Sequence, residues 1–138
     1  MQFDDLWHQY DFTESEVVSM RWEKPLQYAL HIDYYWDLSA GGGKDQVARM
    51  PQPMSITFRH CIRLDIAFTA ASELLIHSPN FGTIVGWQRI NPSPWVEERQ
   101  LSPMNWIDVF FQIGADGYIH ALCREIVVDQ LLVGGYQS

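Results

Sequence analysis

The sequence has little that would mark an exported or membrane-spanning protein. It contains only two cysteines, Cys61 and Cys123, and no apolar run reaches the roughly 18 residues that a membrane span requires. The N-terminus has neither a basic segment nor the apolar stretch of a signal peptide. These absences predict a cytoplasmic protein with two buried thiols. A Cys61–Cys123 disulfide would form only if the strands that carry them are neighbours.

Basic residues are also few. The chain has 9 lysines and arginines against 17 aspartates and glutamates, a formal charge of −8, and no stretch in which the basic residues gather. Proteins that bind nucleic acid or anionic membranes present a basic stripe or patch to the phosphates. The sequence therefore disfavours both kinds of partner.

Motifs for catalysis, metals and cofactors are scarce as well. The five histidines lack the short spacings of a zinc site, and there is no Gly-x-Ser-x-Gly nucleophile motif. The run Gly41-Gly42-Gly43-Lys44 lacks the Ser or Thr, and the following helix, of a phosphate-binding loop. The sequence predicts no metal site and no cofactor.

What the chain does have is apolar residues at alternate positions. It is 138 residues long, 47% apolar and 14% aromatic, enough for one hydrophobic core in a single β-rich domain spanning 1–138. The clearest alternation is in 26–37, and its period of two is typical of a strand with one buried face. The predicted buried face consists of Leu26, Tyr28, Leu30, Ile32, Tyr34 and Trp36.

Other segments share this alternation. Strands are predicted over 15–23, 54–68, 72–77, 82–90, 105–113 and 118–128. The 54–68 segment is too long for one ordinary strand, so we expect a break near His60-Cys61. A short amphipathic helix is predicted over 3–10, and loops over 39–53 and 91–103. The fold class that follows is mainly β (α+β at most): an antiparallel sheet or sandwich of six to eight strands with a short N-terminal helix.

The negative charge is concentrated at the start of the chain. Residues 1–37 hold two basic and eight acidic residues (2 − 8 = −6), whereas the other 101 residues hold seven and nine (7 − 9 = −2). Acids around an exposed aromatic are typical of protein interfaces, and an acidic face steers basic partners toward it. We therefore predict a partner-binding surface for a basic protein. Its predicted residues are His31, Asp33, Tyr35 and Asp37 on the polar face of the 26–37 strand, with Glu14 and Glu16.

Three alternatives stay open from the sequence. In the first, a hydrolase-like enzyme would use His31 and Asp33 as an acid–base pair, or Cys61 as a thiol nucleophile beside Arg59 and Arg63. In the second, the chain is a self-associating structural β-domain. In the third, an exposed tryptophan platform would bind carbohydrate; its candidates are Trp87, Trp95 and Trp106. For Trp22 and Trp36 the alternation predicts core positions instead.

Two short motifs are similar to known families. Residues 10–18, Tyr-Asp-Phe-Thr-Glu-Ser-Glu-Val-Val, resemble the opening of several small bacterial β-rich families, and the predicted hairpin at 111–119, Phe-Gln-Ile-Gly-Ala-Asp-Gly-Tyr-Ile, resembles theirs too. Some of these families are immunity proteins of bacterial polymorphic toxin systems. The resemblance implies a stoichiometric toxin inhibitor without catalytic activity.

Overall fold

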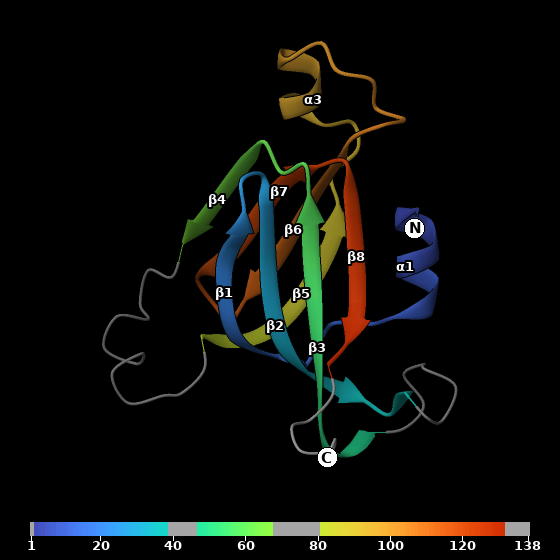
Figure 1. Cartoon of the computed structure of the whole chain (residues 1–138), viewed down its shortest axis with the longest axis vertical. Helices are drawn as coiled ribbons and strands as arrows, with labels where there is room; N and C mark the ends of the chain where they lie inside the picture. The colour runs from blue at the N-terminus through green and yellow to red at the C-terminus, as the bar shows by residue number, and fades with distance from the viewer. Residues whose placement is uncertain (1, 39–46, 68–80, 132–138) are drawn as a thin grey trace.

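Eight antiparallel strands in one sheet, with short helices, make up the described part of the chain (Figure 1). The computed structural model describes residues 2–38, 47–67 and 81–131. The strands are β1 (Glu16–Lys24), β2 (Gln27–Trp36), β3 (Val47–Arg59), β4 (Arg63–Ala67), β5 (Gly82–Arg89), β6 (Ile107–Ile113), β7 (Gly117–Cys123) and β8 (Glu125–Gln130). Their order in the sheet is β4-β7-β6-β5-β1-β2-β3-β8. The predicted fold class, mainly β with a short N-terminal helix α1 (Phe3–Gln9), is confirmed.

The sheet bends sharply where two paired segments of chain are each interrupted between consecutive strands. β3 gives way to β4 and β7 gives way to β8, and backbone bonds tie the two breaks together: Arg124 N–H donates to Arg59 O (3.0 Å) and Ile62 N–H donates to Leu122 O (2.9 Å). The break predicted near His60-Cys61 is confirmed. The single strand predicted over 118–128 is wrong, because a chain paired with a bent strand must bend with it.

The bend brings two halves of the sheet face to face around one core. Phe58 on β3 and Phe111 on β6 belong to strands that are not neighbours, yet their ring centroids are 6.0 Å apart. Trp87 on β5 stacks against Phe111 at 5.8 Å. Helix α1 buries Phe3 and Leu6 in the same core, because its apolar residues lie on one face of the helix.

The predicted loop over 39–53 is partly wrong, because β3 begins at Val47. The prolines of this segment suggested a loop, since proline cannot donate to a strand ladder. The ladder with β2 nevertheless continues to the pairing of Trp36 with Val47, through a register shift after Tyr34. The side chain of Gln52 supports this irregular stretch: its amide donates to Trp36 O and its carbonyl oxygen accepts from Leu38 N–H (3.4 Å). Residues 39–46, with the glycine-rich run, lie outside the described residues.

Two further predictions concern single elements. The strand predicted over 72–77 lies outside the described residues. The loop predicted over 91–103 contains a short helix, α3 (Pro94–Glu98), which makes a second helix in the described ranges. None of the helices within those ranges is long and apolar enough to cross a membrane.

The tip of the β1–β2 hairpin departs from the predicted alternation. Trp22 was predicted in the core but its side chain is 50% exposed and rests against Tyr28 at 5.0 Å. Leu26 was predicted on the buried face but lies in the turn with φ +63° and is exposed. The physical reason is an irregular ladder: its register shifts between Trp22 and Lys24, and Leu26 lies in the turn, so the strict alternation of buried and exposed side chains ends before the tip. Trp36, at the other end of β2, is partly buried against the core.

Candidate functional site

A pocket with three carboxylates lies where β1 begins and β2 approaches its end. Glu16 pairs with Asp33 across the β1–β2 ladder, and Glu14 precedes β1 by two residues. The pocket has a volume of about 400 Å³. We call it the acidic pocket. Its remaining lining residues are Tyr34, Tyr35, Val47, Ala48, Arg49, Met50, Pro51 and Thr83.

The turn before β1 is held in place by its neighbours. Glu14 adopts a left-handed backbone (φ +74°), and its N–H donates to Ile84 O on β5 at 2.7 Å. The buried Ser15 hydroxyl accepts from Tyr35 N–H on β2 at 3.1 Å. These bonds tie the turn to strands on either side of β1, so the Glu14 backbone has a defined position at the pocket.

The carboxylates of the acidic pocket influence one another. Partial burial, and secondly the charge of Glu16, raise the pKa of Asp33 above its ordinary value of 3.8. Glu16 also accepts a hydrogen bond from the Thr83 hydroxyl at 3.2 Å. Desolvation and a like charge both disfavour the ionised form of a carboxyl, and a cation placed between the two groups would reverse that effect.

The outer walls of the acidic pocket are largely apolar. Met50 is 74% exposed, and Val47 and Tyr35 are also exposed. Arg49 contributes one positive charge to the lining, so the described residues of the pocket carry a formal charge of 1 − 3 = −2. Carboxylates beside exposed apolar walls fit a ligand that has both a cationic head and a hydrocarbon stem.

Four of the six predicted partner-binding residues come together in this pocket: Glu14, Glu16, Asp33 and Tyr35. The other two do not line it. His31 is half-buried in the middle of β2, where it pairs with Ser19 and Ser55. Asp37 follows the end of β2 and is also half-buried. The partner-binding role of all six residues stays a prediction.

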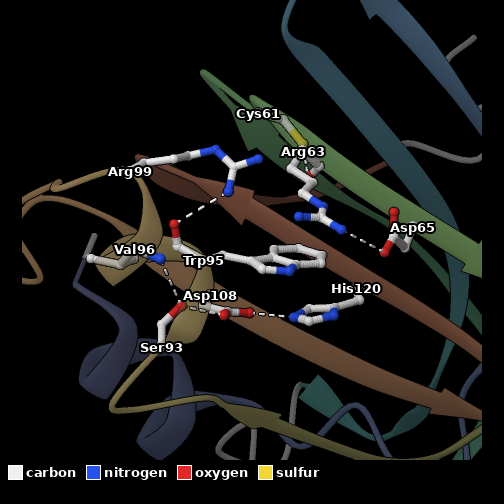
Figure 2. Close-up of polar contacts among 9 residues, drawn as sticks. All are labelled: Cys61, Arg63, Asp65, Ser93, Trp95, Val96, Arg99, Asp108 and His120. Atoms are coloured by element: carbon white, nitrogen blue, oxygen red, sulfur yellow. Dashed lines mark hydrogen bonds and ion pairs between the residues drawn. The ribbon is translucent and has the colours of Figure 1, made fainter.

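A second cluster of polar residues, which the sequence did not predict, lies beneath α3. Asp108 on β6 is 1% exposed, and both of its carboxylate oxygens are used (Figure 2). One oxygen accepts from the Ser93 hydroxyl at 2.5 Å, and the other is 2.5 Å from Nε2 of His120 on β7. We call these three residues the Asp108 cluster.

Aromatic stacking covers the Asp108 cluster. The Trp95 ring stacks on His120 with centroids 3.7 Å apart and planes 15° apart, and the Arg63 guanidinium lies 4.1 Å from the centre of the Trp95 ring (Figure 2). Ser93 also caps α3, because its hydroxyl oxygen accepts from Val96 N–H at 3.2 Å. The cluster therefore fastens α3 to the outer face of β6 and β7.

The order of contacts in the Asp108 cluster excludes a serine-protease type of mechanism in this arrangement. A nucleophilic serine must give its proton to histidine, which a carboxylate orients from the far side. Here Asp108 lies between Ser93 and His120, and the Ser93 hydroxyl is buried. The geometry supports a packing role for this cluster.

Burial counts against Cys61 as the nucleophile of the enzyme alternative, and against two of the three tryptophans of the carbohydrate alternative. Cys61 is 1% exposed, its thiol donates to Arg63 O at 3.4 Å, and burial raises its pKa to about 11, so the thiolate is scarce at neutral pH. Cys61 and Cys123 are both free and buried. Trp87 and Trp95 are buried too, so neither offers an exposed platform for a sugar ring.

Within residues 2–38, 47–67 and 81–131, no group of three or more His, Cys, Asp or Glu side chains is arranged to hold a metal ion. Comparison of the chain with protein-family models, with curated proteins and with solved structures found no match.

Proposed function

We propose that this protein is a protein-binding module whose acidic pocket receives a basic side chain of a protein partner. The observation that carries the proposal is the convergence of Glu14, Glu16 and Asp33, from the turn before β1 and from two paired strands, on one pocket of about 400 Å³. Charged groups brought together in this way gain most from a partner that supplies the opposite charge.

The walls of the acidic pocket favour lysine or arginine over a bare cation. These side chains carry a positive group on an apolar stem of three or four methylenes. In the bound state the stem would contact Met50 and Val47, and the head would lie among the carboxylates. Tyr35 belongs to the residue types that most often anchor protein interfaces.

The charge of the chain supports a basic partner. Six of the eight net negative charges belong to residues 1–37, which include all three carboxylates of the acidic pocket. A field of this kind accelerates encounters with a basic protein. Together with the similarity of 10–18 and 111–119 to immunity-protein families, it leads us to propose a cytoplasmic, stoichiometric inhibitor of a basic toxin, without catalytic activity.

The proposal is tested by neutralising two carboxylates of the acidic pocket and measuring affinity for a hexalysine peptide. We expect E16Q/D33N to bind at least about tenfold more weakly than the wild type, since hydrogen bonds to charged groups contribute roughly 1.5–3 kcal/mol each. The matched control is E98Q/D116N, which removes the same charge from two exposed sites elsewhere. Equal weakening in both variants would show that only net charge matters, and would contradict the proposal.

A further inference from the structure

A cleft with two arginines lies at the opposite end of the sheet from the acidic pocket. It has a volume of about 670 Å³, and α1, the segment before β6 and the junction of β7 with β8 surround it. We call it the arginine cleft. Its lining includes Phe3, Arg89, Asn91, Asn105, Arg124 and Glu125.

The register of the strands separates the two sites. Glu16, the first residue of β1, lines the acidic pocket. Glu125 lines the arginine cleft and pairs with Arg59, which pairs with Gln27 at the β1–β2 turn. The length of β1 between Glu16 and this turn, eight residues, spans about 26 Å. Among the residues that the structure describes, none lines both sites.

The guanidinium of Arg89 is held in a fixed position at the cleft. Its Nη2 donates to the backbone oxygens of Pro103 (3.0 Å) and Trp106 (3.2 Å). A guanidinium has five N–H donors, and the two on Nη2 serve these carbonyls. The three donors on Nε and Nη1 are not used in these two contacts, so Arg89 can bind a further acceptor without leaving its place.

Arg124 contacts the side chain of the same tryptophan. Its guanidinium is 5.7 Å from the centre of the Trp106 ring, a cation–π distance. Trp106 thus positions both arginines, one through its carbonyl and one through its ring. The arginine guanidinium is planar and permanently charged, and it is the usual protein group for bidentate binding of carboxylate or phosphate. Two such groups line this one cleft.

The local charge of the arginine cleft differs in sign from that of the whole chain. Among the described residues of the lining, Glu125 is the acidic one, and its Oε1 lies 3.5 Å from Nη1 of Arg59 on the neighbouring strand. Two arginines therefore face one carboxylate that already has a cationic neighbour. The side-chain amides of Asn91 and Asn105 add neutral hydrogen-bond donors to the lining.

We infer that the arginine cleft binds a small molecule bearing an oxyanion, a carboxylate or a phosphate, between Arg89 and Arg124. A small molecule is the class of ligand that a cleft of about 670 Å³ accommodates. Phe3, Pro103 and Ile107 would contact the carbon skeleton of the ligand, while the guanidinium groups bind its anionic end.

The test is a calorimetric titration of the full chain with inorganic phosphate, succinate and citrate, in chloride-free buffer. We expect saturable binding of at least one of these anions, and an affinity loss of at least tenfold in R124Q with an unchanged melting temperature. Arg124 is the residue to change, because Arg89 also holds 103–106 in place. The phosphate and dicarboxylate arms identify which oxyanion the cleft prefers.

The matched control is R21Q, which removes one positive charge from an exposed position on β1 outside the cleft. Unchanged anion affinity in R21Q supports the inference. No saturable binding of any of the three anions, or equal weakening in R21Q and R124Q, would overturn it. Because the acidic pocket is a separate site, either result leaves the hexalysine test of the proposed function independent.

Discussion

Asp108 and the carboxylates of the acidic pocket have opposite surroundings. Asp108 is almost fully buried, and both of its oxygens are bonded to side chains of the same chain, those of Ser93 and His120. Asp33 faces a pocket with Glu16 beside it. Burial and this neighbouring carboxylate raise its pKa. The partners of a carboxylate, more than its burial, therefore distinguish a residue that holds the fold together from one available to a ligand.

The largest effect that separates the two groups should come from D108A. The change leaves the Ser93 hydroxyl and one ring nitrogen of His120 without their partner beneath α3. Each unsatisfied buried polar group costs about 1–3 kcal/mol, so we expect the free energy of unfolding to fall by roughly 2–4 kcal/mol. Urea denaturation measures this loss.

Two further measurements bear on the same variant. D108N keeps the size of the side chain and one carbonyl acceptor, and should lose less stability than D108A. Hexalysine affinity should be unchanged in both variants at a temperature where they are folded. If D108A were as stable as the wild type, Asp108 would not be a residue that holds the fold together.

The second effect concerns Asp33 and pH. Because its pKa is raised in the folded chain, the folded state holds the proton to a higher pH than the unfolded state, and stability falls as pH rises between the two pKa values. D33N abolishes this dependence. We therefore expect D33N to melt at the same temperature as the wild type, or at a higher one, at pH 7.

Binding should show the opposite sign at the same residue. A cationic side chain binds the ionised form of Asp33, so hexalysine affinity of the wild type should fall as pH drops through the raised pKa. In D33N this part of the pH dependence should vanish. Titrations at several pH values and constant ionic strength test it; identical pH profiles in the two proteins would show that Asp33 does not contact the cation.

The smallest effect should come from the apolar wall. Met50 is 74% exposed, so M50A should leave the melting temperature within about 1 °C of the wild-type value. Loss of its contact with a lysine stem should weaken hexalysine binding by about two- to fivefold. V85A is the matched control, since Val85 is an exposed apolar residue outside the pocket lining. Equal losses in both variants would argue against a specific wall.

The sequence was a good guide where side chains alternate against the core. The strands containing Ile32, Val109 and Ile119 were predicted, because one face of each is buried. Prediction failed where contacts with other segments override the local sequence pattern. One place is the bend near Arg124. The other is Val47, where the Gln52 side chain supports a ladder that two prolines would be expected to end.

The candidate sites show the same division. Four of the residues predicted for the partner surface meet in one pocket, because a hairpin brings the start of β1 opposite the end of β2, as with Glu16 and Asp33. The Asp108 cluster was missed, since Ser93 comes from a connecting segment whose path no local pattern predicts. The Ser93-Pro94 pair was a usable signal, because serine at the cap and proline at the first helical position mark the start of a helix.

The most direct test of the acidic pocket as a binding site is an NMR titration of the labelled full chain with hexalysine. We expect the amide shifts of Glu14, Glu16, Asp33 and Tyr35 to change together and saturate, whereas those of Asp108 and His120 stay constant. Shifts that spread evenly over the exposed acidic residues of the chain, Asp116 included, without saturation would contradict binding in the acidic pocket.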